Sequence, residues 1–469
     1  MKHFFLFFVL FATSAGILQS QDSSSLLQQY KFRTHGFRAL QLNVNAAGDF
    51  TDAKRINADD GKSNQINSAF QITYFRIVST DKRQHQSSIQ LNPSYNQIQN
   101  ETGSAYQRFR NLNLQANWNR IDRFYNSRNF FFEIGNELVV SGGRQKNASD
   151  TRTFISNNNY AADKLIIGVG KGRIENIQDA QMALFIVNDL RRSGLLQQEP
   201  DAATMYELAV LITDINNRRV FDNRIRRIYE LTRLDSFFQS KQLIATPSIA
   251  YFTTVNDNWA LAFNPGRFRG TRLYAQVNPG IRFDESGMDQ KGLNINEFNS
   301  NSKTFSYFYS PEIGIEHYKP VGLHWQQNVT ASLQFQQTFT RQKLKTESTG
   351  TVTENENFST LPEVLFHSFY GFGYYPNNRT IVNAGLNFDA SYGKGFWEYY
   401  ILSPGVRVNA DYFINYRTRL FLTTGLNYRY TDVKNYVPGL ITYDKNLITA
   451  NFNFGLSPVS YTHLTLPTN

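Results

Sequence analysis

The stretch NLNLQANWN, Asn111–Asn119, shows most clearly how this chain is built. Its even-numbered positions carry Leu, Leu, Ala and Trp, and its odd-numbered positions carry only Asn or Gln. Because successive strand residues point to opposite faces, one face would be apolar and the other lined with uncharged amides. A strand of this kind suits a wall between lipid and water, and also a half-buried strand of a soluble sandwich. Repetition along the chain decides between these two interpretations.

Comparable alternation recurs through most of the sequence, for example where Leu40, Leu42 and Val44 alternate with polar amides. The segments that we predict as strands are 37–48, 66–78, 84–98, 106–120, 129–141, 163–172, 246–255, 258–265, 271–283, 303–318, 322–342, 361–374, 379–391, 397–413, 417–431 and 444–456. They amount to roughly 16 strands, and each strand of a barrel gives only a weak signal. So many amphipathic strands in one chain favour a transmembrane antiparallel β-barrel, in an all-β fold class.

Ile174–Lys241 is the only part of the mature chain that reads as helix, because its apolar residues recur every three and four positions. Asn176 with Asp179 suits a first helix start, Ser193-Gly194 suits its end, and Pro200 or Asp201 suits a second start. These signals predict an inserted segment of three helices between two blocks of strands.

The composition excludes several classes of protein. The chain has 469 residues, 15% of them aromatic but only 18% charged, and no cysteine. Disulfides, thiol catalysis and cysteine-ligated metals are therefore ruled out. The net charge of +10 comes from basic residues that are scattered among carboxylates. Scattered charge favours solvated loops, and no nucleic-acid partner is expected.

The two ends of the sequence differ from the rest. Residues 1–20 read as a secretory signal peptide, with a basic start and an apolar run too short to span a bilayer. Residues 460–469, SYTHLTLPTN, show no alternation and read as a non-native tail on a truncated reading frame. The predicted domains are then 21–173 for the first half of the barrel, 174–241 for the insert and 242–459 for the second half.

Short and long connections alternate along the chain. Short turns near residues 80–83, 122–127, 319–322, 376–379 and 414–417 alternate with long polar loops near 49–65, 142–162, 284–302, 343–360 and 432–443. Outer-membrane barrels place short turns at the periplasmic rim and long loops at the external rim. Counting strands from a periplasmic N-terminus places the helical insert on the periplasmic side.

With this pattern the chain resembles the outer-membrane β-barrel proteins of Gram-negative bacteria, and it is broadly porin-like. The helical insert, which contains VFDNRIRRIYEL, is similar to an element of uncharacterised barrels of this class. The resemblance implies localisation in the cell outer membrane and contact with outer-membrane lipid and lipopolysaccharide. It attaches no activity to the insert.

No motif for catalysis, cofactor binding or metal binding stands out. LIIGVGKG, Leu165–Gly172, lacks the third glycine and the βαβ setting of a nucleotide fold. His85 and Ser87 lie two apart on one strand face, as in outer-membrane phospholipases, but no Asn-Gly follows them. His317 and His324 could face each other across a turn but lack a third ligand. We therefore expect no enzyme, cofactor or metal.

One group of side chains is a candidate contact for a partner. It consists of the insert's arginines Arg218, Arg219, Arg224, Arg226, Arg227 and Arg233. Nine basic and nine acidic residues balance over 176–241, so a self-compensated solvated face is one interpretation. An arginine ridge that contacts an acidic periplasmic protein, peptidoglycan or lipid head groups is the other.

Two functions follow from the sequence. The first is a porin-like barrel that allows or gates passage of small polar solutes, with the helical insert at its periplasmic mouth. The alternative is an outer-membrane anchor or assembly protein whose helical segment docks a periplasmic partner.

Overall fold

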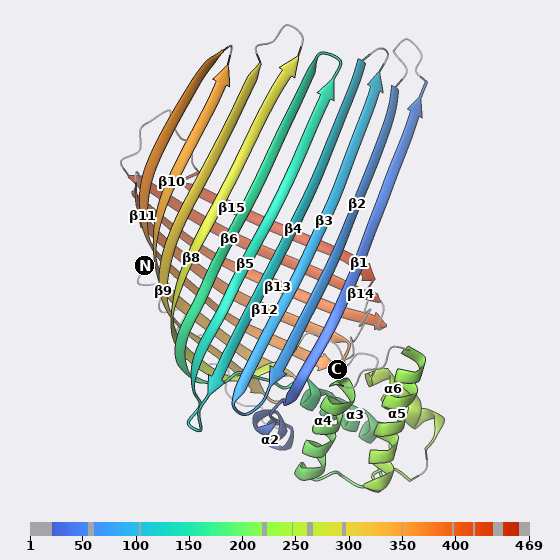
Figure 1. The fold of residues 1–469 in the computed structure, drawn as a ribbon. Helices are drawn as coiled ribbons and strands as arrows, with labels where there is room; N and C mark the ends of the chain where they lie inside the picture. Colours follow the sequence, from blue (N-terminus) through green and yellow to red (C-terminus); the bar gives the residue numbers. More distant parts are fainter. Residues whose placement is uncertain are drawn as a thin grey trace.

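The structure is a computed structural model (Figure 1). The structure describes residues 21–54, 61–102, 105–217, 223–245, 247–259, 266–292, 297–348, 350–395, 398–415, 418–434 and 444–458. The predicted signal peptide, 1–20, and the predicted tail, 460–469, lie outside these residues.

Among the described residues, fourteen long strands form one antiparallel sheet, and each pairs with the next long strand in sequence. They are β1 (Thr34–Ala53), β2 (Gly61–Ser79), β3 (Arg83–Thr102), β4 (Ala105–Tyr125), β5 (Phe130–Ser149), β6 (Arg152–Gly172), β8 (Phe268–Gly292), β9 (Phe298–Val321), β10 (Trp325–Ser348), β11 (Thr351–Asn377), β12 (Thr380–Lys394), β13 (Glu398–Asn415), β14 (Thr418–Lys434) and β15 (Asn446–Pro458). The two-residue strand β7 (Glu175–Asn176) pairs with β8. Within the described residues, these strands confirm the predicted antiparallel barrel wall.

The ladder register sorts the side chains onto two faces, as the alternation predicts. Leu112, Leu114 and Trp118 are more than a third exposed, and the exposed Ile313 and Leu426 belong to the same apolar face of other strands. We call this the outer face and the amide-bearing one the inner face. An exposed apolar face of this extent is stable only against lipid, so the wall is lipid-facing.

Aromatic residues pair at both ends of the apolar band. Trp325 and Tyr374, at the end of the sheet nearer the helices, have ring centroids 4.5 Å apart. Tyr307 and Phe339 stack at 4.7 Å toward the opposite end. Amphipathic and aromatic rings at two levels are the interfacial girdles that flank the lipid-facing band of a barrel.

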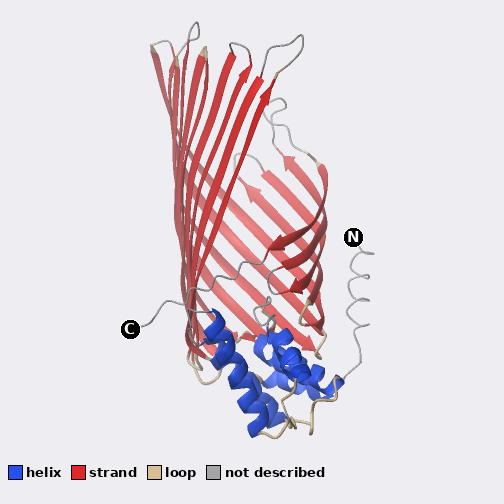
Figure 2. Ribbon diagram, turned by 90° about the vertical axis from the view of Figure 1, so that its right-hand side faces the viewer, coloured by secondary structure: helices blue, strands red, loops and turns tan. Residues whose placement is uncertain are grey.

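The helices gather beyond one end of the sheet (Figures 1 and 2). They are α2 (Gln21–Gln29), α3 (Gln178–Arg192), α4 (Ala202–Asn217), α5 (Asn223–Ser240) and α6 (Ile249–Trp259). The short turns after β2, β4, β9 and β11 lie at this same end, because β6 leads into α3 and α6 leads back to β8. We call α2–α6 the helical domain.

The predictions for 246–255 and 258–265 need correction. Residues 249–259 form helix α6, so the strand predicted at 246–255 is wrong. The strand predicted at 258–265 begins inside this helix, and its remaining residues, 260–265, lie outside the described residues. Tyr251, Val255 and Trp259 are buried at helical spacing, and Ser248 accepts a hydrogen bond from the Tyr251 amide at 3.2 Å. The Tyr, Phe, Thr and Val content suggested a strand, but packing decided for helix. The three helices predicted in 174–241 are confirmed as α3, α4 and α5, and among the described residues α6 adds a fourth helix before β8.

Three of the predicted long loops are mostly strand. β5 and β6 continue to Ser149 and Arg152, and the pairs β8–β9 and β10–β11 extend in the same way beyond the apolar band. Lys303 pairs with Glu285 across the β8–β9 hairpin at 3.1 Å. Cross-strand polar pairs of this kind keep a hairpin extended in water, which a reading based on apolar alternation cannot detect.

The sheet curves around an axis and leaves two edges (Figure 2). Within the described residues, β1 pairs only with β2 and β15 only with β14. Because unpaired backbone groups are costly in hydrocarbon, both edges require a partner in the bilayer.

Candidate functional site: the helical domain at the barrel mouth

The helical domain has its own apolar core. Ile186, Leu208 and Ile212 have less than 2% of their surface exposed, and helix α2 adds Leu27 and Tyr30 to the same core. On α3, Ala180, Ala183, Val187 and Leu190, which recur every three and four positions, are all buried. Asn176 accepts from the Gln178 amide at 2.8 Å. Burial on this scale makes the domain a packed unit rather than a set of loops.

A polar network crosses this core. The Asp179 carboxylate accepts hydrogen bonds from Thr213 Oγ1 at 2.6 Å and from Asn216 Nδ2 at 3.1 Å. Tyr30 contacts Thr213 through their hydroxyls, so α2, α3 and α4 meet at one point. Burial raises the pKa of Asp179 to about 6 and also raises the pKa of Tyr30.

At one side of the mouth, ion pairs join the segments that connect the helical domain to β1 and β6, and Thr34 of β1 donates to Asn217 of α4 at 3.1 Å. Glu175 pairs with Arg33 at 3.0 Å and with Arg173 at 2.8 Å. Arg33 also pairs with Asp81, in the turn between β2 and β3, at 2.8 Å. We call Arg33, Asp81, Arg173 and Glu175 the near contact, and it joins the start of β1 to the end of β6.

An apolar contact lies at another part of the rim. Phe185 of α3 packs with Tyr375, Ile381 and Phe413, which belong to β11, β12 and β13. All four side chains are buried. Tyr375, Ile381 and Phe413 share the face of His367, Asp389 and Asn409, so they belong to the inner face. The helix therefore reaches into the base of the barrel.

Polar groups of α6 reinforce this attachment. Asn378, in the turn after β11, donates to Asn258 at 2.5 Å, and Arg379 pairs with Asp257. Asn258 in turn donates to Asp189 of α3 at 2.8 Å. We call these residues, together with the Phe185 cluster, the far contact.

Arg267 anchors the return of the chain from the helices to β8. It is completely buried, and its guanidinium donates to the carbonyl oxygens of Gly322, Leu323 and Trp325 at 2.5–2.8 Å. It lies 4.9 Å from the Tyr375 ring centre, and burial lowers the pKa of Arg267 to about 10. The helical domain is thus attached at β1–β3, β6, β8, and β10–β13, around much of the mouth.

The inner face carries a row of alternating charges close to this mouth. Arg272 pairs with Glu316 at 2.5 Å and lies 3.8 Å from Glu133, which also pairs with Arg123. We call Arg123, Glu133, Arg272 and Glu316 the charge ladder. All four side chains are less than a quarter exposed, so the inner face is crowded at this level.

Of the six arginines proposed as a partner contact, three have side chains among the described residues. Arg218 and Arg219 lie outside the described residues, and so does the side chain of Arg224. Arg226 and Arg227 pair with Glu230, at 2.7 Å and 3.5 Å. Glu230 also accepts from Trp259 at 2.6 Å, which makes it part of the α5–α6 packing. Arg233 is exposed.

The other motifs have structural explanations. In LIIGVGKG, Gly168 and Gly170 lie within β6, and a Cβ at Gly170 would meet the Phe131 ring at 2.4 Å. The histidines His317 and His324 do not face each other, since their Nδ1 atoms contact Thr271 Oγ1 and the Tyr375 carbonyl.

His85 and Ser87 do not form a hydrolytic triad in the described structure. His85 Nδ1 lies 2.9 Å from Asp122, and Asp122 also accepts from Arg83 at 2.6 Å and from Arg120 at 2.8 Å. No hydrogen bond between Ser87 and His85 occurs among the described residues. A carboxylate shared by two guanidinium groups is poorly placed to stabilise an imidazolium.

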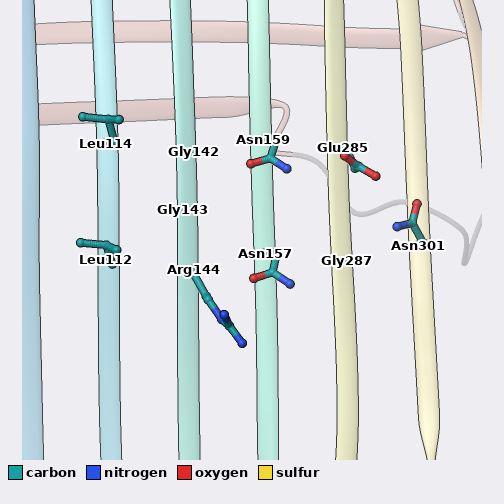
Figure 3. Close-up of a pocket in the computed structure, with 10 residues that line it drawn as sticks. All are labelled: Leu112, Leu114, Gly142, Gly143, Arg144, Asn157, Asn159, Glu285, Gly287 and Asn301. Carbon is teal, nitrogen blue, oxygen red and sulfur yellow. The ribbon is translucent and has the colours of Figure 1, made fainter.

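A shallow hollow of about 400 Å³ lies on the outer face of β4–β9, where the apolar band ends (Figure 3). Leu112 and Leu114 border it, followed by Arg144, Asn157 and Glu285. In the described residues, no group of three or more His, Cys, Asp and Glu could hold a metal ion, and no helix is long and apolar enough to span a membrane.

Neither a protein-family model nor a curated protein matches the sequence. Among solved structures, the chain is similar to the translocator domain of the autotransporter NalP from Neisseria meningitidis, with 8% identity, a TM-score of 0.28 and coverage of 80% of this chain and 90% of that one. It is similar to the Pseudomonas putida toluene transporter TodX, with 9% identity, a TM-score of 0.31 and coverage of 90% and 96%. TM-scores this low establish neither a shared family nor a shared activity.

The residues that attach the helical domain were not identified from the sequence. Arg33, Arg267 and Phe185 are separated by long stretches of chain and meet only in the fold. One signal was present: Arg267 and Arg269 flank the first residue of β8, where the apolar band has not yet begun.

Proposed function

We propose that the chain is an outer-membrane channel for small polar solutes, and that the helical domain restricts its periplasmic mouth. The observation that carries this proposal is the set of attachments on separate parts of the rim. The near contact joins the segments that connect the domain to β1 and β6, and α4 is bonded to β1 through Asn217 and Thr34, while the far contact holds β11, β12 and β13. A domain that is fixed at both places lies across the opening between them.

The chemistry of the inner face supports passage of polar rather than apolar solutes. Gln334 and Gln336 on β10 are joined by a side-chain hydrogen bond of 3.3 Å, and Gln115 and Asn117 on β4 by another of 3.3 Å. Amides and hydroxyls can replace the hydration of an uncharged polar solute without fixing its charge. The charge ladder near the mouth contains two positive and two negative groups, so it favours neither sign strongly.

Conductance in planar bilayers tests this function. We expect small or infrequent current steps from the full chain, and larger steps after Gln178–Trp259 is replaced by a short glycine–serine linker. The matched control is R191A/E199A, which removes an exposed ion pair within the domain and leaves both rim contacts intact. If neither the full chain nor the linker variant gives current, the channel is rejected. If the two give equal current, restriction of the mouth by the domain is rejected.

The exposed surface of α5 favours the second function, an anchor that docks a periplasmic partner. Ile225 and Ile228 are 53% and 61% exposed on a helix that also presents Arg233. Exposed apolar side chains and an exposed arginine on one helix are typical of a contact surface. Sedimentation with purified peptidoglycan tests one such partner: R233E should reduce binding if the ridge is used, whereas T232E on the same helix controls for added negative charge.

The proposal includes no enzymatic activity. Asp122 is shared among His85, Arg83 and Arg120, as described above. Lipid hydrolysis, if present, should be unchanged by Ser87→Ala. Loss of hydrolysis in that variant would instead assign a catalytic function to this strand face.

A further inference from the structure

The outer face of β1–β5 departs from the apolar pattern in two adjacent rows, one with His85 and Asp122 and one that begins with Arg38 and Arg76. Arg38 lies directly opposite Arg76, Arg76 opposite Ser87, Ser87 opposite Arg120, and Arg120 opposite Asn136. We call this row the polar stripe. It belongs to the outer face because two residues further along their strands are Leu40, Tyr74, Ile89, Trp118 and Leu138.

The arginines of the stripe are poorly neutralised by the protein. Arg120 pairs with Asp122, but no ion pair involves Arg38 or Arg76 among the described residues. The Nε atoms of Arg38 and Arg76 are buried and have no hydrogen-bond partner there. Like charges that lie directly opposite each other on neighbouring strands destabilise a sheet. An anion bound between them would remove that cost.

The level of the stripe on the wall indicates which anion can reach it. Arg76 is three residues from the end of β2, close to the turn on the helical-domain side. Trp118 and Ile89, 36% and 41% exposed, lie immediately toward the middle of the apolar band. Phe124 and Ile134, 45% and 40% exposed, continue the apolar face on the other side of the stripe on β4 and β5. Lipid-exposed apolar side chains therefore border the stripe toward the middle of the band, and on the other side they lie beyond the buried His85 and Asp122.

We propose that the polar stripe binds the phosphate of an anionic phospholipid in the membrane leaflet nearer the helical domain. Guanidinium groups of Arg38 and Arg76 would donate to the phosphate oxygens, and Ser87 lies in the same row to donate its hydroxyl. The acyl chains would lie along the exposed apolar residues Ile89, Leu91 and Phe70. This inference depends on the lipid-facing wall and is independent of whether the barrel conducts.

Native mass spectrometry of the full chain, refolded in a neutral detergent and titrated with phosphatidylglycerol, tests the proposal. We expect R38Q/R76Q to bind phosphatidylglycerol at least about tenfold more weakly than the unmodified chain, because two charged contacts are lost. R128Q is the matched control, since Arg128 is an exposed arginine in the β4–β5 turn at the same end of the barrel but outside the stripe. It should bind as the unmodified chain does.

Two further experiments distinguish binding of a lipid from binding of free phosphate, and a loss of binding from a loss of folding. Inorganic phosphate at the same concentration should not displace phosphatidylglycerol, and displacement would overturn the assignment to lipid. R38K/R76K keeps both charges and should retain most of the binding. If R38Q/R76Q shows the heat-dependent electrophoretic mobility of a folded barrel and still binds as tightly as the unmodified chain, the proposal is wrong.

Discussion

The helical domain and the barrel wall bury opposite chemistry. In the domain, Ile186 and Ile212 are completely buried. In the wall, Ile313 is 58% exposed, whereas the polar residues Asn278 and Ser310 on the opposite face are almost completely buried. Because the same residue types take opposite places within one chain, the solvent must differ: water surrounds the domain and lipid surrounds the wall.

The difference also explains how the two regions are joined. A water-facing domain cannot use the apolar outer face for attachment, because lipid covers it. The contacts instead use strand ends and turns, where Arg33, Arg267 and Arg379 donate to carboxylates and carbonyl oxygens. The Phe185 cluster is the one apolar attachment described, and it lies on the inner face.

The largest expected effect comes from shortening the same residue type in each region. Ile212→Ala should cost the helical domain about 2–5 kcal/mol, because a cavity remains in a packed core. Ile313→Ala should cost only the hydrophobic transfer free energy of the deleted carbon atoms, about 1–2 kcal/mol, because lipid chains fill the space that they leave. Urea unfolding in a W118F/W325F/W397F background, which leaves Trp259 as the fluorescent reporter of the domain, together with far-UV circular dichroism measures both. Equal costs would contradict the assignment of two solvents.

A charge placed on either face of one strand tests the wall directly. Leu333→Arg places a cation on the outer face of β10 and should cost about 2–4 kcal/mol in liposomes. Gln334→Arg, one residue further on the inner face, should cost less than about 1 kcal/mol. Unfolding from phospholipid vesicles gives both values, and a reversed order would mean that the faces are assigned wrongly.

The pH dependence of the helical domain should reflect Asp179. Its pKa is raised to about 6 in the fold, from a model-peptide value near ~3.9, so the native domain binds the additional proton between these pH values. Stability from this group is therefore greatest below about pH 4 and falls by about 2–3 kcal/mol as the pH rises through 6.

Asp179→Asn should remove this slope, since the amide oxygen can still accept from Thr213 or Asn216. The measurement is the difference in unfolding free energy between the two proteins at pH 4.5 and pH 7.5. An unchanged pH dependence in the variant would show that Asp179 does not titrate in this range.

The smallest effect on stability is expected at the far contact. The side chains of Arg379 and Asp257 are 34% and 58% exposed, so Arg379→Ala should cost less than about 1 kcal/mol. It should nevertheless increase the frequency of current steps in planar bilayers, because one attachment at the mouth is lost. Asp81→Ala, which weakens the near contact, provides the comparison.

Much of the wall could be predicted from the sequence because its signal is local. Alternation between Leu and Asn residues, as in Asn111–Asn119, reports directly on the two faces of a strand. Helix α6 could not be predicted in this way, because Tyr251, Phe252 and Thr253 have high strand propensity and its burial depends on α3 and α5. Tertiary packing overrode the local preference.

The candidate site could be predicted only in its location. Alternation of short and long connections placed the helices beside the short turns, and the structure has them there. The attachments themselves depend on pairs such as Arg33 with Glu175, which are far apart in sequence and have no local pattern. The arginines named from the sequence formed a local cluster, and two of the described ones serve the packing of α5 through Glu230.

The central claim is that the helical domain restricts the mouth, and fixing the domain in place tests it most directly. The chain has no cysteine, so N258C/N378C introduces one thiol on each side of the far contact. R191C/E199C, a pair within the domain, is the control for the cysteines and the reagent. Bridging Asn258→Cys to Asn378→Cys with a short cleavable bis-thiol reagent should abolish current steps, and cleavage should restore them. Current steps that persist unchanged in the bridged protein would contradict the account.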